Sequence, residues 1–261
     1  PILHTDSKAS QFDTRGTQGK KLMNRVKTQL SPILAVLVLG FAGSANAGLI
    51  RVAQESAPGA GDFGANVLGF IETYSTSLTI AGFYDYSSPN AASYNGDNNG
   101  GPGDVSNTSQ SFFVEASDGL HYVVVHDVAS DATGGNTRMT SVLLGGAGGG
   151  TTFTVEDDPG EGTSVADSGG DRIFSADHNW APCCTDGFAI GSLAGDDTIY
   201  ASFDSLPSSI NAWQATNASG TDISLVIATD RRVEFSVPEP MTLSLLGIGL
   251  IAAGAMRRRQ G

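Results

Sequence analysis

The chain has 261 residues, a formal net charge of -13 and 34 glycines, and 16% of its residues are charged. This composition excludes a charged disordered segment and a helix-rich bundle, and the chain is long enough to bury a core. Between Gly48 and Val237 it holds five arginines, no lysine and most of the acidic residues, which excludes DNA and RNA binding because nucleic-acid affinity depends on neutralising phosphates with Lys and Arg.

Residues 23–47 have the order of a secretory signal. Two basic side chains come first, an apolar run covers 33–42, and the small residues Ala45 and Ala47 follow. A buried or amphipathic core helix is the alternative, but the apolar run has no polar face. We therefore predict export, with signal peptidase acting after Ala47. The polar residues 1–22 are interpreted as an over-extended start.

The region 48–236 predicts one acidic, all-β domain. Runs of β-branched or aromatic residues are bounded by glycine, aspartate and asparagine, and no clear amphipathic helix separates them. This pattern favours an antiparallel, jelly-roll-like β-sandwich over a parallel α/β fold. The predicted strands are Ser77–Tyr84, Ser111–Ala116, Leu120–Ala129, Arg138–Gly145, Thr151–Asp157, Gly187–Leu193, Asp197–Phe203, Asp222–Ala228 and Arg232–Ser236.

One predicted strand shows how the sheets should face solvent. In the run from 197 to 203, Ile199, Ala201 and Phe203 alternate with more polar residues, as expected of a sheet that is wet on one face. Two long loops, rich in glycine with asparagine or acid, are expected at residues 87–109 and 157–170.

Cys183 and Cys184 are the only cysteines, and they are adjacent. A disulfide is the default outside the cytoplasm, although neighbouring Cα atoms lie about 3.8 Å apart, short of the roughly 4.4 Å usual for disulfides. A vicinal bridge that locks a tight turn is one interpretation, and pairing between chains and a free dithiol are the others. A cysteine nucleophile is not expected, because nothing near His178 supplies electropositive surroundings that lower a thiol pKa.

Two histidines, His121 and His126, lie in one predicted strand. Their odd separation puts them on opposite faces, so they cannot bind one metal ion together. For the same reason His126 and Asp127 cannot form half of a hydrolase triad, and the chain has no GxSxG motif. Serine hydrolysis is therefore not expected.

The acidic loops suggest a calcium site as a hypothesis. Calcium takes about six to eight oxygen ligands, and flexible loops with carboxylates and amides supply them. None of these loops matches the pattern D-x-[DN]-x-[DN]-G-x5-E, and solvated turn acids are the alternative. The candidate ligands are Asp97, Asn99, Asp104, Glu156, Asp157, Asp158, Glu161, Asp196 and Asp197.

A sugar-stacking platform is a further hypothesis, although aromatic residues of a sandwich more often lie in its core or rim. Pairs of carboxylates for glycoside hydrolysis occur in any chain this acidic and decide nothing. The candidate stacking residues are Trp180, Trp213, Tyr84, Tyr86 and Tyr94.

The end of the chain has the order of a membrane-targeted tail. Val237, Pro238, Glu239 and Pro240 are followed by an apolar segment over 241–256 and by the arginines Arg257, Arg258 and Arg259. A straight helix of that length spans about 24 Å, a marginal match to a hydrocarbon core of about 30 Å. The arginines favour a cytoplasmic C-terminus, and the basic segment near Met23 keeps the N-terminus inside too, so the body is expected across the membrane.

This order resembles the PEP-CTERM sorting signal of Gram-negative bacteria, and the resemblance covers residues 237–259. It implies recognition by an exosortase, a membrane cysteine transpeptidase that cuts near the Pro-Glu-Pro motif and releases or transfers the body. It also implies a host that makes exopolysaccharide and a biofilm or floc matrix. An ordinary tail anchor with a proline-rich hinge is the alternative. A second block, residues 177–193, looks like a recurrent segment of one PEP-CTERM subgroup and implies no activity.

The sequence thus predicts an exported, non-catalytic protein of the cell surface or extracellular matrix, cleaved at both ends. Residues 237–261 form its transient anchor in the inner membrane. Signal peptidase, an exosortase and the host exopolysaccharide are the expected partners, and no cofactor is expected apart from the hypothetical calcium. A carbohydrate-binding module, assisted by calcium, is the second interpretation, and a secreted hydrolase is the third.

Overall fold

The computed structural model describes residues 48–86, 93–129, 132–146 and 149–237. The chain divides into two compact units, residues 1–45 and 46–261, and every described residue belongs to the second. The predicted signal peptide and the predicted tail from Pro238 onward lie outside the described residues.

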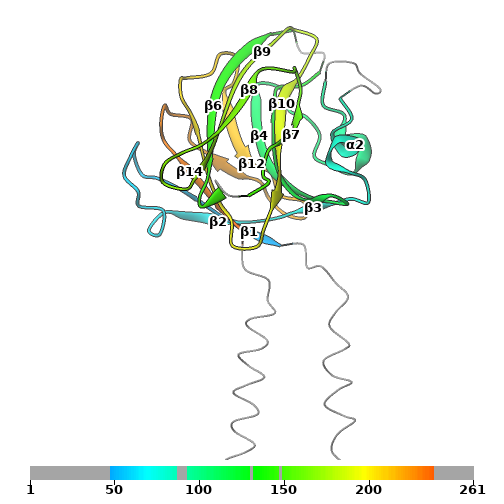
Figure 1. Ribbon diagram of the computed structural model, residues 1–261. Helices are drawn as coiled ribbons and strands as arrows, with labels where there is room; N and C mark the ends of the chain where they lie inside the picture. Colours follow the sequence, from blue (N-terminus) through cyan, green and yellow to red (C-terminus); the bar gives the residue numbers. More distant parts are fainter. Residues whose placement is uncertain (1–47, 87–92, 130–131, 147–148, 238–261) are drawn as a thin grey trace, which may run out of the picture. The chain divides into compact units, whose positions relative to one another are not determined.

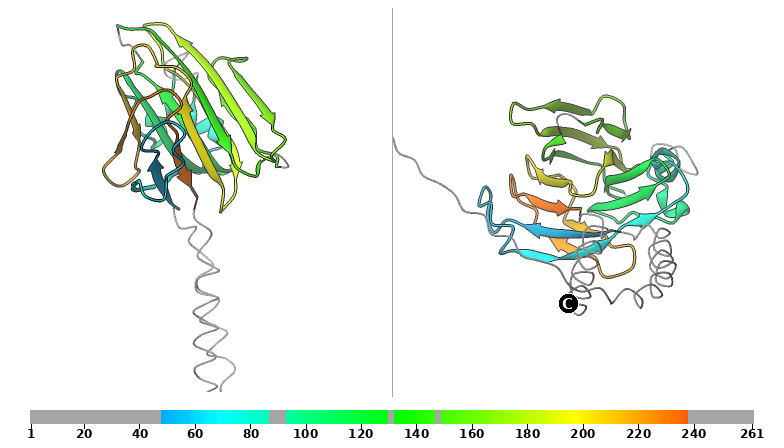
Figure 2. Two further views of the ribbon diagram at one scale, coloured as in Figure 1. Left: turned by 90° about the vertical axis from the view of Figure 1, so that its left-hand side faces the viewer. Right: turned by 60° about the horizontal axis from the view of Figure 1, so that its bottom comes forward.

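Two β-sheets make up the domain (Figure 1). The first, which we call sheet A, is antiparallel throughout. The right-hand view of Figure 2 follows its order, from β2 in cyan and β1 in blue through β14 in orange. In spatial order its strands are β2 (Val67–Glu72), β1 (Leu49–Gln54), β14 (Val233–Ser236), β11 (Thr198–Phe203), β6 (Gly135–Leu143), β9 (Arg172–Trp180) and β8 (Gly162–Ala166).

The second sheet, sheet B, is mostly antiparallel, but β4 pairs in parallel with β12 and with β3 along one edge. Its strands are, in spatial order, β13 (Ile223–Leu225), β12 (Ala212–Ala215), β4 (Thr108–Ala116), β5 (Gly119–His126), β10 (Asp186–Leu193) and β7 (Phe153–Glu156), with β3 (Tyr74–Ser75) beside β4. The predicted all-β sandwich is confirmed.

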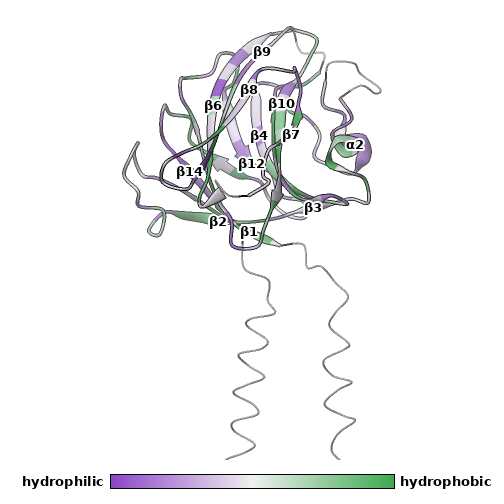
Figure 3. Cartoon of the chain, in the orientation of Figure 1, coloured by the Kyte–Doolittle hydropathy of each residue, from purple (hydrophilic) through white to green (hydrophobic). Residues whose placement is uncertain are grey.

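The main core lies between the two sheets. Phe235 of β14 contacts Phe113 of β4 and Tyr122 of β5, with ring centroids 5.7 Å and 5.3 Å away. Each buried aromatic side chain of this size contributes about 1.5–3 kcal/mol to stability. In β11, Ile199, Ala201 and Phe203 face this core, as the alternation predicted. Figure 3 shows the contrast between apolar β10 and the polar residues of β6 and β9.

Sheet B is buried on both faces, because a second apolar cluster covers its outer side. Phe112, Val123 and Val125 point into it, while their neighbours in β4 and β5 point into the main core. Strands buried on both faces are near-continuous apolar runs, and the three consecutive valines of β5 have that pattern. The cover consists of α2 (Ile80–Tyr84), the 3-10 turn η1 (Gly96–Asn99) and the segments beside them.

The predicted strand at residues 77–84 is wrong, because most of it forms the helix α2. Thr79 caps the helix by accepting a hydrogen bond from the backbone N–H of Gly82, and Asp118 accepts one from Ile80 N. Such caps satisfy helix donors that have no partner within the helix. Ile80, Phe83 and Tyr84 are buried, at the i, i+3, i+4 spacing of a helical face.

The predicted loop over 157–170 is also wrong in part, since β8 occupies its middle. β8 is a short edge strand that pairs only with β9, and four of its five residues are exposed. An exposed edge strand carries little apolar pattern, which explains why composition alone indicated a loop. Other strands absent from the prediction are β1, β2, β3, β9 and β12.

An ion pair between buried Glu55 and partly exposed Arg232 closes one end of sheet A, between the end of β1 and the start of β14. The Glu55 carboxylate is fully buried and accepts hydrogen bonds from the backbone N–H groups of Gly59 and Gly61 and from Arg232. The Arg232 guanidinium lies over the rings of Phe63 and Tyr200, 5.5 Å and 5.1 Å from their centroids. These groups tie the loop after β1 to the last strand.

Candidate functional site

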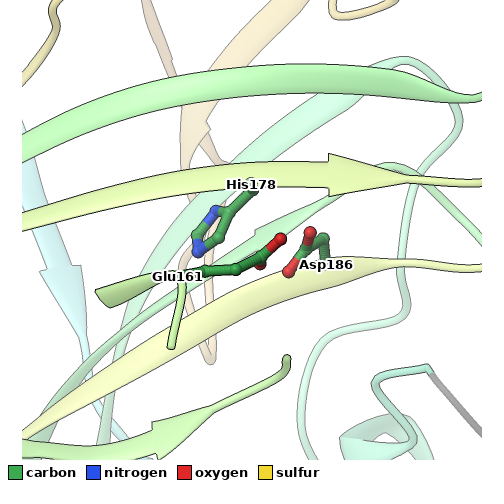
Figure 4. A group of neighbouring side chains, drawn as sticks. All are labelled: Glu161, His178 and Asp186. Atoms are coloured by element: carbon green, nitrogen blue, oxygen red, sulfur yellow. The ribbon is translucent and has the colours of Figure 1, made fainter. Parts of the chain in front are cut away.

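Two connections cross from one sheet to the other at the same end of the sandwich. The turn between β7 and β8 carries Glu161, and the turn after β9 leads to Asp186 at the start of β10. His178, near the end of β9, lies between them. Figure 4 shows the three side chains pointing toward one another from these separate segments. We call Glu161, His178 and Asp186 the crossover cluster.

The crossover cluster is compact and mostly inaccessible to water. One potential ligand atom from each residue lies within 4.8 Å of the other two. His178 and Asp186 are each 2% exposed, and Glu161 is half-buried. The Asp186 carboxylate accepts hydrogen bonds from the backbone N–H groups of Gly187 and Asn179, which fix its orientation. His178 Nδ1 and Glu161 Oε2 are buried and have no hydrogen-bond partner.

The electrostatics of the cluster disfavour its charged forms. Burial, and next the charge of Glu161, raises the pKa of Asp186 to about 8. Burial and the nearby Asp158 raise the pKa of Glu161 as well. Burial lowers the pKa of His178 to about 4, so the imidazole is neutral at pH 7. The cluster therefore holds a neutral imidazole beside two carboxyl groups whose pKa values are raised.

Asp157 adds a further carboxyl group beside Asp186. It is buried, its Oδ2 accepts a hydrogen bond of 2.9 Å from the Tyr84 hydroxyl, and its Oδ1 has no partner. Burial, and next the charge of Asp186, raises the pKa of Asp157 to about 9. The acidic group thus extends from the crossover cluster toward the cover of sheet B.

Aromatic rings pack against the imidazole of His178. The His126 ring lies 5.0 Å from that of His178 and stacks on the Trp180 ring at 5.7 Å. Trp180 is anchored in turn, because its indole N–H donates a hydrogen bond of 3.0 Å to Asp127. His126 Nε2 lies 3.1 Å from the Thr137 hydroxyl. This packing fixes the imidazole of His178 on the side away from the carboxylates.

A shallow hollow leads from the surface of β8 and β9 to the cluster. Its volume is about 420 Å³, and its lining includes Glu161, Thr163 and Ser175. Arg138 and Asp177, which form an ion pair across β6 and β9, also line it. Glu161 belongs both to this hollow and to the crossover cluster, whereas His178 and Asp186 do not line the hollow.

Of the predicted calcium ligands, only Asp157 and Glu161 lie at this site. Asp104 accepts a hydrogen bond from Ala129 N, and the Asn99 amide donates to backbone carbonyls of α2. Glu156 accepts from Gly160 N. Asp97 accepts from Asn98, Asp158 from the Tyr86 hydroxyl and Asp197 from Ala194 N. The calcium hypothesis stays a prediction.

The predicted sugar-stacking platform is wrong. Trp180, Trp213, Tyr84 and Tyr94 are all buried in the two cores, where the other rings cover their faces. Only Tyr86 is partly accessible. These rings stabilise the sandwich and present no flat aromatic surface to a sugar.

The cysteines and the other histidines have structural positions. Cys183 and Cys184 are joined by a disulfide in the turn between β9 and β10. His121 contacts Thr154 and Asp118, whereas His126 points into the sandwich beside His178, so the two lie on opposite faces of β5 as the sequence predicted.

The sequence prediction missed the role of His178 and Asp186. Both lie in the block 177–193, where a histidine and an aspartate flank the cysteine pair. That grouping was the available signal, but nothing in it indicates that Glu161 joins them from the other crossover.

Comparison with protein families places a PEP-CTERM protein-sorting motif at residues 236–259. The chain therefore carries the sorting signal that its C-terminal residues resemble. No curated protein and no solved structure matches the chain. Among the described residues, no helix has the length and apolar character needed to cross a bilayer, and the predicted span 241–256 lies outside them.

Proposed function

We propose that this chain, an exported protein sorted by an exosortase through its PEP-CTERM motif, is a non-catalytic component of the cell surface or extracellular matrix. Signal peptidase releases it after Ala47, and the exosortase cuts near Pro238 to Pro240. The body from Gly48 to Ser236 then remains outside the cell, free or re-anchored, in contact with exopolysaccharide.

One observation carries this proposal: the sorting motif begins at the last residue of the last described strand. The motif starts at Ser236, which is the last residue of β14 and pairs with Arg51 and Thr198. A cut near Pro238 to Pro240 would therefore remove no residue of any described strand of either sheet. The acidic body suits a soluble, hydrated layer, since net charge far from zero keeps proteins dispersed.

The non-catalytic assignment has support from the positions of the reactive residue types. The two cysteines are bonded to each other. Among the described residues, His121 and His126 contact threonine hydroxyls, and His178 Nδ1 has no hydrogen-bond partner. None of these contacts joins a histidine to a serine or a thiol.

Carbohydrate binding is the second candidate, and the hollow beside β8 and β9 favours it. Arg138, Glu161 and Asp177 line this hollow with groups that hydrogen bond to sugar hydroxyls. A rise in the melting temperature of the protein with added host exopolysaccharide would support this role.

Replacing both Pro238 and Pro240 by alanine should block processing in the native host. The variant should stay in the membrane fraction at full tail length, whereas the wild-type protein should appear at the surface or in the medium without its terminal arginines. Intact mass spectrometry of each fraction measures the outcome. Pro207→Ala, a proline outside the motif, is the matched control and should be processed like the wild type. Identical processing of the motif variant would refute the sorting role, and wild-type protein retained in the cytosol would refute export.

A further inference from the structure

We propose that Glu161, His178 and Asp186 bind a divalent metal ion of the zinc class. This inference is independent of how the chain is sorted. It assigns a binding site to the end of the sandwich where both crossovers meet.

The geometry is close to that of a metal site. Atoms that bind one zinc ion lie about 2.0–2.2 Å from it, so they are about 3.4 Å apart. In the crossover cluster, the three potential ligand atoms lie within 4.8 Å of one another. Asp186 and His178 are held by strands and by packing, whereas Glu161 extends from a turn. Of the three ligands, Glu161 is therefore the one that has to move to close the remaining distance.

Unpartnered buried atoms point to a missing ligand. His178 Nδ1 and Asp157 Oδ1 belong to side chains that are 2% and 3% exposed, and neither has a hydrogen-bond partner. Buried polar atoms almost always have a partner, and each exception calls for an explanation. Glu161 Oε2 is a third such atom in the same group. A cation bound by the crossover cluster supplies a partner to the buried atoms of His178 and Glu161.

The charge balance of the site points the same way. Glu161, Asp186 and Asp157 repel one another in a buried environment, and Asp158 adds to the field. The nearest cation, Arg138, is paired with Asp177 on the outside of β9. A dication at the centre of this group offsets the repulsion among these carboxyl groups.

The ligand set selects the class of metal. Calcium and magnesium take oxygen ligands, whereas zinc and its neighbours accept imidazole nitrogen together with carboxylate oxygen. The neutral imidazole of His178 has a free lone pair, and the His126 and Trp180 rings behind it fix its direction. The site is therefore distinct from the calcium ligands predicted at residues 97–104. Of the three proposed ligands, Glu161 also lines the surface hollow.

Zinc titration of the purified full chain against a chromogenic chelator tests this assignment. We expect one zinc ion per chain, and visible absorption bands when Co²⁺ replaces zinc. Glu161→Gln should lower zinc affinity at least about tenfold, since even outer-shell changes at metal sites cost that much. Asp196→Asn removes the same charge from an exposed residue beyond the end of β10 opposite Asp186 and should bind zinc nearly as tightly as the wild type.

Two further measurements keep the result interpretable. Circular dichroism and melting curves should show that Glu161→Gln is folded, and His178→Gln should lose the Co²⁺ bands while a fold signal remains. Equal zinc affinity in Glu161→Gln and the wild type would overturn the assignment. So would a wild-type chain that binds calcium but no stoichiometric zinc.

Discussion

Replacing Glu55 by alanine is expected to destabilise the folded domain by about 1–3 kcal/mol, the cost of leaving the hydrogen-bond donors around a buried carboxylate without their acceptor. The change leaves the Arg232 guanidinium without its carboxylate and the N–H groups of Gly59 and Gly61 without their acceptor. Urea unfolding, followed by the midpoint at constant m, measures the loss. Glu72→Ala is the control: this carboxylate accepts no hydrogen bond among the described residues, and its loss should change stability little.

The Glu55 contribution should also depend on pH. Burial by itself raises the pKa of Glu55, but the hydrogen bonds from Arg232 and Gly61 outweigh it, and the net pKa lies below the ordinary value of 4.5. A lowered folded-state pKa stabilises the protein above the unfolded pKa, and this stability is lost as the pH falls through the folded value. The difference between wild type and Glu55→Gln should therefore be full at neutral pH and shrink below about pH 4.5. A difference that grows in acid would contradict this account of the pair.

Asp127→Ala is expected to lower the free energy of unfolding of the domain by about 3–5 kcal/mol. Two separate losses contribute to this value. The Asp127 side chain is fully buried and accepts hydrogen bonds from Asn107 N, Val128 N and the Trp180 indole N–H. Its backbone also has a positive φ of 63°, which alanine adopts at a cost of about 1–2 kcal/mol.

Two companion variants separate these sources. Asp230 has a positive φ of 57° but is exposed, so Asp230→Ala should show the backbone cost alone, about 1–2 kcal/mol. Asp127→Asn keeps one acceptor oxygen and tolerates positive φ, so its loss should lie between the other two. Urea unfolding of all three variants decides the matter, and an Asp127→Ala loss no greater than that of Asp230→Ala would remove the hydrogen-bond explanation.

Much of the fold could be predicted from local pattern. The alternation in β11 gave the correct buried face, and the valine run of β5 gave a strand. The pattern failed at Ile80–Tyr84, where Thr79 and Asp118 cap a helix whose buried residues are also good strand formers. It failed again at β8, an edge strand with little apolar character.

The crossover cluster could not be predicted in the same way. His178 and Asp186 lie in one short block, but Glu161 reaches them only because β7 and β8 belong to different sheets, as do β9 and β10. Sheet membership depends on long-range strand pairing, which the chain pattern does not reveal. The acidic residues near 157 led to the calcium hypothesis. His178, whose imidazole is the reason for proposing a zinc-class metal, lies in β9, a strand that the prediction missed.

The position of β14 sets the order of events in the biogenesis of this protein. The ribosome makes β1 early and β14 last, yet β14 is the strand that joins β1 and β2 to β11. Nearly the whole polypeptide must therefore emerge before the outermost pair of strands can be joined to the rest, and such distant pairing is slow. The domain therefore completes its fold only when β14 is available, and β14 directly precedes the residues near which the exosortase is proposed to cut. The last step of folding and the proposed cleavage thus involve neighbouring parts of the chain.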